Sequence, residues 1–347
     1  MTKPILYDQT SENLQAVLRE LGQPAYRLKQ LEEGLYQHRY MDFSEFTTLP
    51  KSLLDSLEDR FSLFPLEVKQ EIISRDKRTE KFLFKLQDDN YIETVLMHYE
   101  GRHTVCISTQ VGCPMGCVFC ATGQMGYTRN LTAGEILSQI IFCMRKLQEA
   151  GTDLTNVVYM GMGEPFLNYD EVMSSITRLT DQKGLNFGAR RITISTVGIL
   201  PLIRQFTEAK SQVNLALSLH AANDALRSAL VPANEFYPLS ALIEASKKYT
   251  DYTHRRVLIE YALIDGVNDT LAHADELATL LHGMLCLVNL IALNPSHDSN
   301  YGGSPREKVE AFRDRLMKRG IQTTIRLKRG IEINAGCGQL ATTEKGK

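Results

Sequence analysis

The sequence has little net charge, no long apolar run and no apolar N-terminal stretch, and these absences limit the classes of protein to which it can belong. The formal net charge is only −2, so the overall balance does not indicate a nucleic-acid partner, and an RNA-binding surface would have to be a local basic patch. No apolar run approaches the roughly 20 residues that a membrane-spanning helix needs. The first fifteen residues lack the apolar stretch of a signal peptide. We therefore expect a cytoplasmic protein with no membrane partner.

Cysteine is also scarce, with seven in the chain, yet three of them fall within eight residues. In a reducing compartment, an odd number with such crowding favours metal binding or redox chemistry over a structural disulfide framework. The rest of the composition is ordinary for a globular protein, with 43 % hydrophobic and 23 % charged residues. A length of 347 residues suits one large domain and a small accessory one.

The period of the apolar residues divides the chain in two. Residues 1–85 show helical spacing and no catalytic cluster, which predicts an N-terminal helical domain and a candidate for RNA binding. Over residues 86–347, β-branched runs alternate with amphipathic helices, which implies a parallel sheet with covering helices. About six such units predict an α/β fold, a partial (βα)6, TIM-like barrel. The expected strands are 91–99, 103–109, 156–160, 190–196, 213–220, 255–264, 285–294 and 321–327.

The crowded cysteines form a C-x3-C-x2-C motif of Cys113, Cys117 and Cys120, directly after the strand at 103–109. Three thiolates on one short loop can hold three corners of a four-iron cluster and leave the fourth iron open for another ligand. Zinc usually takes four protein ligands, and no second cysteine or histidine pair lies nearby in the sequence. Zinc binding and a chance group of buried cysteines both stay open as explanations of the motif.

Small polar residues recur where successive strands end. In barrels of βα units the active site gathers at the carboxyl ends of the strands, so these residues are expected to share one rim. Each one alone is also typical of an ordinary turn or cap, but together they suit a ligand with an amino-acid head, a ribose and a base. They are Gly163, Glu164, Ser195, Ser218, Leu219, His220 and Asn294.

The remaining cysteines differ in their surroundings. Cys106 lies on the strand that enters the cysteine loop, and Cys337 lies between two glycines near the end of the chain. Flanking glycines let a sulfur approach another group closely, which favours a nucleophile or covalent carrier for Cys337. Cys143, in a helix, and Cys286, in a β run, are interpreted as small buried residues.

Taken together, these motifs closely resemble the radical S-adenosylmethionine (SAM) methyltransferases of the RlmN/Cfr family. The resemblance runs from the N-terminal module to Leu340. The stretches that carry it are Thr104–Cys113, the cysteine motif, Gly161–Pro165, Ser218–His220, Val288–Ile291, Asn294–Pro295 and Ala335–Leu340.

The resemblance implies a radical SAM barrel that methylates carbon 2 of an adenosine in 23S rRNA, at the peptidyl transferase centre. It also implies the same reaction on some tRNAs, at the adenosine next to the anticodon. The implied cofactors are a [4Fe-4S] cluster and SAM, two molecules of which are used per turnover. An electron donor such as flavodoxin and a monomeric state are expected with them.

Residue roles follow from the same resemblance. Cys113, Cys117 and Cys120 would bind the cluster. Gly163 and Glu164 would hold the SAM amino group, and the rest of SAM would be held by Ser195, Ser218, Leu219, His220 and Asn294. Cys337 would accept the methyl group, Cys106 would be its redox partner, and Glu93 would be the proton acceptor.

An order of events is implied as well. A first SAM methylates the Cys337 thiolate by displacement. A second SAM is cleaved reductively, and the resulting 5′-deoxyadenosyl radical takes hydrogen from methyl-Cys337. The carbon radical adds to the base, and Glu93 or another base removes the carbon-2 proton. Cys106 then attacks the sulfur of Cys337 and releases methylated RNA, leaving a transient disulfide.

Local basic residues offer modest support for an RNA substrate. Two groups of basic residues could contact phosphates. One lies at the junction of the two expected domains, and the other lies just before the Cys337 segment. A solvated charged face is the simpler interpretation for any one of them. The groups are Lys77, Arg78, Lys81 and Lys85, and Arg326, Lys328 and Arg329.

The chain departs from the family pattern at two positions, and the resemblance leaves three competing functions open. The family usually has an acid and an alanine where this chain has Asn334 and Gly336, which puts the positioning of the cysteine loop in question. A Cfr-type enzyme would methylate carbon 8 and confer antibiotic resistance, although Pro165 and the run 166–168 favour the RlmN branch. The second competing function is a different radical SAM enzyme acting on protein or small molecules, and the third is a zinc-bound RNA module.

Overall fold

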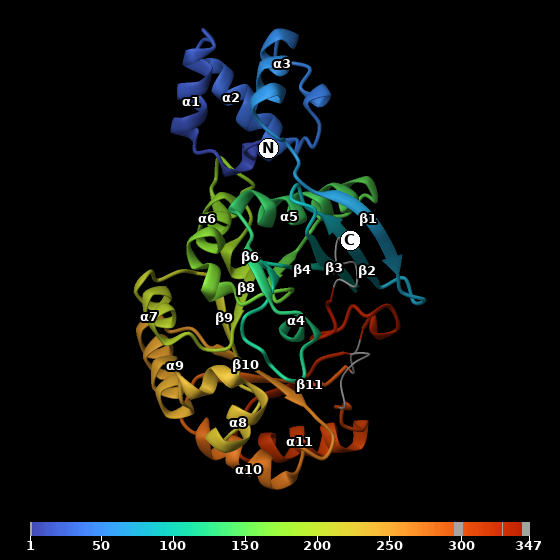
Figure 1. Ribbon diagram of the computed structural model, residues 1–347. Coiled ribbons are helices and arrows are strands. Elements are labelled where there is room, and N and C mark those ends of the chain that lie inside the picture. Colours follow the sequence, from blue (N-terminus) through green and yellow to red (C-terminus); the bar gives the residue numbers. More distant parts are fainter. Residues whose placement is uncertain (1, 295–300, 328, 342–347) are drawn as a thin grey trace.

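The computed structural model describes residues 2–294, 301–327 and 329–341. The chain begins with a group of helices that stands at one end of the molecule (Figure 1). These are η1 (Leu6–Asp8), α1 (Ser11–Glu20), α2 (Tyr26–Glu32), η2 (Glu33–Gln37), η3 (Phe43–Glu45) and α3 (Lys51–Arg60). The predicted N-terminal helices are thus confirmed as far as Arg60.

Helix is the wrong expectation for the next part of the chain. Strands β1 (Glu67–Ile73) and β2 (Thr79–Lys85) form an antiparallel pair and extend the main sheet. Phe82 and Phe84 are both fully buried and pack against Phe142. Their ring centroids lie 5.0 and 5.1 Å, respectively, from the ring centroid of Phe142. Large apolar residues two positions apart mark one face of a strand, and this period of two overrides the helical spacing before it. The sheet therefore begins before residue 86.

One mixed sheet of ten strands forms the centre of the molecule, in the order β1-β2-β3-β4-β7-β8-β9-β10-β11-β12. The first four strands pair antiparallel, since β3 and β4 are joined by a tight turn and not by a helix. From β4 onward all pairs are parallel, which confirms the predicted α/β fold with its open parallel sheet. The strands are β3 (Tyr91–Tyr99), β4 (Arg102–Ile107), β7 (Asn156–Tyr159), β8 (Ile192–Thr196), β9 (Asn214–Ser218), β10 (Val257–Leu263), β11 (Cys286–Ala292) and β12 (Thr323–Ile325).

Helices connect the parallel strands and cover the sheet (Figure 1). Helix α5 starts with the predicted capping box, in which the Thr132 side chain accepts from the Glu135 backbone and the Glu135 side chain accepts in return. The helices of the core are α4 (Ala121–Gln124), α5 (Ala133–Glu149), η4 (Pro165–Asn168), α6 (Tyr169–Thr180), η5 (Ala189–Arg191), α7 (Leu200–Glu208), α8 (Asp224–Leu230), η6 (Pro232–Glu235), α9 (Leu239–Thr253), α10 (Leu271–Leu280), α11 (Arg306–Lys318) and η7 (Ile331–Ile333). In the described part of the chain, no helix has the length and apolar character that crossing a membrane would require.

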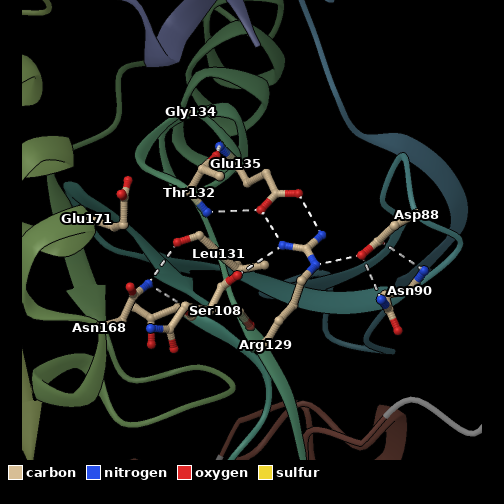
Figure 2. A network of polar contacts seen from close by, with 12 residues as sticks. Asp88, Asn90, Ser108, Arg129, Leu131, Thr132, Gly134, Glu135, Asn168 and Glu171 are labelled. Atoms are coloured by element: carbon tan, nitrogen blue, oxygen red, sulfur yellow. Dashed lines mark hydrogen bonds and ion pairs between the residues drawn. The ribbon is translucent and has the colours of Figure 1, made fainter. Parts of the chain in front are cut away.

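A small second sheet closes the base of the cysteine loop. Strands β5 (Gln110–Gly112) and β6 (Tyr127–Asn130) pair antiparallel on either side of that loop. From β6, Arg129 donates to both carboxylate oxygens of Glu135, at 2.8 and 2.9 Å, and to Asp88 beyond β2, at 2.6 Å (Figure 2). A single guanidinium thus joins the loop to the capped end of α5 and to the turn between β2 and β3.

Candidate active site

Two adjoining cavities lie at the carboxyl ends of the parallel strands. Both are lined by Cys120, Arg326 and Cys337. The structure brings most of the predicted residues to their walls, as the topology of parallel strands requires. The first cavity is lined by Cys113, Cys117, Gly163, Glu164, Ser195, Ser218 and His220, and the second by Cys106 and Asn294.

The three motif cysteines line the first cavity from an anchored loop. The backbone N–H of Cys113 donates to the Gly126 carbonyl at 2.8 Å, and that of Val118 donates to the Leu230 carbonyl at 3.1 Å. Burial raises the pKa of Cys113 to about 12, and it also raises the pKa values of Cys117 and Cys120. Burial therefore opposes the thiolate form in the protein alone, and a bound metal centre is what would favour it.

The arrangement of the thiols fits a cluster. All seven cysteines are free in this structure. No group of three His, Cys, Asp or Glu side chains converges on one ion within the described residues. A four-iron cluster does not need such convergence, because each thiolate binds a different iron atom.

Glu164 is a buried carboxylate that is held by neutral hydrogen-bond donors. Its two oxygens accept from the backbone N–H groups of Phe166, at 3.0 Å, and Val197, at 2.9 Å. Burial raises the pKa of Glu164 to about 7, against the opposing effect of these hydrogen bonds. A carboxylate held in this way at a cavity wall can receive an amino group, which fits the amino-acid head of SAM.

Gly163, the residue before Glu164, has a structural role that was not predicted from the sequence. Gly163 has a φ of +106°, and a Cβ atom there would lie 2.7 Å from Cβ of Gln110. Gln110 also accepts from the backbone N–H of Glu164 at 2.8 Å and donates to Asn130 at 2.8 Å. The close approach thus serves the neighbouring strand β5, which sets the position of Glu164.

Ser195 and Ser218 come together from neighbouring strands, with 3.0 Å between their hydroxyl oxygens. His220 follows in the left-handed region with a φ of 62°. Its Nδ1 accepts from the backbone N–H of Ala262 at 3.0 Å, so the proton of the neutral ring is on Nε2. Burial lowers the pKa of His220 to about 3, so the ring is a neutral donor at the first cavity.

Leu219 is the predicted cofactor residue that does not line either cavity. Its side chain is fully buried in the core, and its backbone N–H donates to the Glu260 carbonyl at 3.0 Å. Its carbonyl accepts from Nε of Arg227 at 3.1 Å. Both backbone groups of Leu219 are therefore used within the protein and its side chain packs in the core, whereas Ser218 and His220 line the cavity.

Asn294 lies in the second cavity, against the Cys337 segment. Its Oδ1 is buried and has no hydrogen-bond partner among the described residues. An orphaned acceptor at a cavity wall costs free energy unless a ligand satisfies it. This acceptor, the Glu164 carboxylate and the Nε2–H donor of His220 together fit a SAM molecule whose amino-acid end lies at the cysteine loop.

Cys106 and Cys337 face the same cavity, as the proposed pairing of the two requires. Burial raises the pKa of Cys106 to about 12. Arg326 lines both cavities, and the negative charge that Cys337 carries as a thiolate, followed by that of Glu260, raises the pKa of its guanidinium. This cation lines both cavities, and its expected contact with an RNA phosphate stays a prediction.

Glu93 does not line either cavity. It is 4 % exposed and forms an ion pair with Lys81, with 2.8 Å between Oε1 and Nζ. Burial raises its pKa, and the charge of Lys81 acts in the opposite direction. Its strand neighbours Val95 and Met97, on the same face, do line the second cavity, so Glu93 lies at the edge of that cavity.

The basic residues selected from sequence differ in their burial and in their contacts. Lys81 is buried, so it is not a phosphate contact. Lys85 pairs with Asp89 at 2.6 Å, and Arg329 stacks over the Tyr99 ring at 4.5 Å. Lys77 and Arg78 are exposed on the turn between β1 and β2. Lys328 and Pro295 lie outside the described residues.

Arg227 is a site residue that sequence reasoning missed. It is fully buried, and besides Leu219 it donates to the Val197 carbonyl at 2.6 Å and to Asn234 at 2.8 Å. Burial lowers its pKa to about 10. These bonds tie together the loops that follow β8 and β9. No local signal reveals this, because arginine is common in a short helix such as α8.

An α/β fold with a large parallel sheet, three cysteines on its first strand-to-helix loop and a cavity at the strand ends defines a radical SAM enzyme. In agreement, residues 107–278 match the family model described as the Radical SAM superfamily. The chain also resembles a probable dual-specificity RNA methyltransferase RlmN of Staphylococcus carnosus, with 46 % identity over 345 residues that cover 99 % of this chain and 94 % of the relative.

Dual-specificity RNA methyltransferase RlmN 1 of Myxococcus xanthus is 47 % identical over 342 residues, which cover 99 % of this chain and 95 % of that protein. The crystal structure of a radical SAM methyltransferase from Sphaerobacter thermophilus superposes with a TM-score of 0.95 at 50 % identity, covering 97 % of this chain and 99 % of the other. The chain belongs to the RlmN family, and it is a radical SAM RNA methyltransferase.

Proposed function

We propose that this enzyme methylates carbon 2 of an adenosine in 23S rRNA, at the peptidyl transferase centre, and of the adenosine next to the anticodon in some tRNAs. The observation that carries the proposal is the place of Cys337, which lines both the cavity of the cluster cysteines and the cavity of Cys106. A sulfur at this junction can receive a methyl group on one side and present it to a base on the other. Carbon 2 is favoured over carbon 8 because the relatives carry the name RlmN.

The first task of the chain is to bind and orient SAM. Glu164 receives the amino group, the paired hydroxyls of Ser195 and Ser218 face the ribose, and His220 donates from Nε2. Asn294 supplies its unpaired Oδ1 from the second cavity. A [4Fe-4S] cluster held by Cys113, Cys117 and Cys120 supplies, when bound, the electron for reductive cleavage of SAM.

The second task is carried by Cys337. Its thiolate attacks the methyl carbon of SAM, so a new sulfur–carbon bond forms on Cys337 while the methyl–sulfonium bond breaks and its electron pair leaves with the SAM sulfur. The guanidinium of Arg326 lines both cavities together with this nucleophile.

Glu93 and Cys106 complete the reaction on the RNA side. Once the methylene radical of Cys337 has added to carbon 2, Glu93 accepts the carbon-2 proton, and the adduct would return one electron to the oxidised cluster, which restores the aromatic ring. Cys106 attacks the sulfur of Cys337, so that a sulfur–sulfur bond forms, the bond from Cys337 to the new methyl carbon breaks, and that carbon takes a proton. An external thiol reductant then returns both cysteines to the free state seen here.

The setting of the reaction is proposed on the same basis. Ribosomal and transfer RNA are cytoplasmic, and reduced cysteines persist there. A small one-electron carrier such as flavodoxin serves as the electron donor, and the enzyme acts as a monomer. The helices of residues 6–60 and the exposed Lys77 and Arg78 offer surface for RNA, whose target base has to turn out of its stack to reach the cavity.

Mass spectrometry of digested 23S rRNA and tRNA tests the proposal. The chain is expressed in a host that lacks its own enzyme, and 2-methyladenosine is expected in both RNAs. Cys337→Ala should abolish the product but keep the iron content and the cluster spectrum. If 8-methyladenosine alone is found, the carbon-2 assignment is wrong, and if Cys337→Ala still methylates RNA, the carrier role is wrong.

A further inference from the structure

A buried ion pair outside the cavities links the proton acceptor to the methyl carrier. Lys81 lies on β2 and Glu93 on β3, and only 10 % of the lysine side chain and 5 % of the glutamate side chain are exposed. Lys81 is directly opposite Val95 in the sheet register, so Lys81, Glu93 and Val95 share one face. Val95 lines the second cavity together with Cys337. The pair therefore lies at the edge of the RNA-side cavity.

Both members of the pair also hold the segment that carries Cys337. The Lys81 ammonium donates to the Asn334 carbonyl at 3.4 Å, before Cys337. The second oxygen of Glu93, Oε2, accepts from the backbone N–H of Ala341 at 3.0 Å, after Cys337. The C-terminal segment runs back to this part of the sheet, beside β3 (Figure 1). One ion pair thus clamps the segment 334–341 on both sides of the cysteine.

Two further bonds hold the same segment to the cluster side. The Thr122 hydroxyl donates to the Leu340 carbonyl at 2.6 Å, and the Ala121 N–H donates to the Gly338 carbonyl at 2.8 Å. The segment is therefore held to α4 as well as to β2 and β3. Oε2 of Glu93 is the oxygen that contacts the segment, whereas Oε1 is held by Lys81.

The burial of Lys81 requires a reason, because a buried ammonium is costly unless it is paired. Surface binding of RNA does not supply one, since the side chain does not reach the surface. We propose that Lys81 is a positioning residue, which holds Glu93 as a carboxylate at the edge of the cavity and keeps it in place beside the Cys337 segment. The inference rests on the proposed role of Glu93 as proton acceptor.

The electrostatics agree with this geometry. Burial raises the pKa of Glu93, and Lys81 is the charged group that opposes the shift, with a smaller contribution from the Ala341 N–H. The backbone of Glu93 is held by neutral groups, since its carbonyl accepts from the Ser108 hydroxyl at 2.6 Å and its N–H faces the Met162 sulfur at 3.3 Å. Removal of the lysine charge would therefore leave the carboxyl protonated at a higher pH.

The experiment measures single-turnover RNA methylation as a function of pH in the full-length holoenzyme. In Lys81→Met, the acidic limb of the profile should move up by about one pH unit or more, which lowers the rate at a fixed pH on that limb about tenfold or more. Lys81→Arg keeps the cation and should restore most of the wild-type rate and of the wild-type position of the acidic limb. Lys69→Met is the matched control, because Lys69 on β1 pairs with Glu67 at the surface and should leave both unchanged.

A double-mutant comparison separates this role from a general loss of packing. If Lys81 acts through Glu93, then Lys81→Met should change the rate by less than about twofold in a Glu93→Gln background. Equal losses in both backgrounds, or a Lys81→Met profile that matches the wild type, would overturn the proposal. Iron content is measured for each variant, and Lys81→Gln replaces Lys81→Met should the latter lose iron.

Failure of the proposed function, of the role of Glu93 and of the role of Lys81 would each give different rates of methylation. If the wild-type enzyme methylates RNA but Glu93→Gln is as fast as the wild type, then the role of Glu93 is wrong and that of Lys81 falls with it. If the wild type yields no methyladenosine, then the proposed function itself is wrong. If Glu93→Gln is slow and Lys81→Met is normal, only the positioning role of Lys81 is wrong.

Discussion

Gly336 lies against the side-chain amide of Asn294, so closely that a Cβ atom on the glycine would be 2.3 Å from Nδ2. The same Cβ would lie 2.6 Å from Oε1 of Gln339, which accepts from the Gly336 N–H at 2.9 Å. The lack of a side chain at Gly336 is therefore what allows the Cys337 segment to close on Asn294. With an alanine at this position, the amide of Asn294 or the segment has to move.

Gly336→Ala should weaken the binding of SAM. Since the Asn294 amide or the segment that packs on it is displaced, the loss of one hydrogen bond to SAM is expected to raise the KM for SAM by about three- to tenfold. The iron content should not change, because the atoms that a Cβ at Gly336 would meet first belong to Asn294 and Gln339. Steady-state kinetics with varied SAM provide the measurement, and an unchanged KM would show that the close contact has no role in binding.

Cys117→Ala should abolish cluster binding. Purified without oxygen, the wild-type protein should hold about four iron atoms per chain, and the variant only a small fraction of that. Cys143→Ala is the matched control, because Cys143 is a buried cysteine in α5 and lines neither cavity. Iron and sulfide analysis distinguishes the outcomes. Zinc in place of iron in the wild type would contradict the radical mechanism.

His220 should make stability depend on pH in the acid range. Its pKa is lowered to about 3 in the folded protein, so the neutral ring stabilises the fold above the unfolded pKa of about 6.5, and this contribution is lost as the pH falls toward about 3. Within that window the group contributes a slope of about 1.4 kcal/mol per pH unit to the free energy of unfolding.

His220→Asn should remove that slope. Asparagine tolerates the positive φ and can place an acceptor near the Ala262 N–H, but it does not titrate. Urea unfolding between pH 5 and pH 6.5 gives the comparison, with the difference between the two proteins as the quantity of interest. Parallel pH curves would mean that His220 is not held neutral.

Arg129→Met should destabilise the base of the cysteine loop. The substitution leaves Glu135 without its guanidinium, and the side chain of Glu135 is only 5 % exposed, so a loss of about 2 to 3 kcal/mol in the free energy of unfolding is expected. Arg306→Met removes an exposed pair with Glu310 and should cost less than about 1 kcal/mol. Chemical denaturation measures both, and similar losses would show that the network in Figure 2 is no stronger than a surface pair.

Local sequence patterns predicted much of the fold and the site. The Thr132–Glu135 capping box, the alternation of strands and helices after residue 103 and the order of polar residues at the strand ends all appear in the structure. These features depend on spacing along the chain, and parallel topology then brings the strand ends to one rim. Helix was the wrong prediction over residues 67–85, where a short run of alternating phenylalanines was outweighed by its helical context.

The features that sequence left undecided depend on contacts between distant parts of the chain. A lysine in a strand has the same local pattern whether it faces water or a buried carboxylate, and only the pairing of β2 with β3 places Lys81 on Glu93. Likewise, neither Arg227 nor the fit of Gly336 against Asn294 has a local signature. The sequence by itself determined the cysteine motif, the strand–helix order and the family. The tertiary structure alone decided which charges are buried, and it joined the two cavities at Cys337, because burial and proximity arise from packing between residues far apart in the chain.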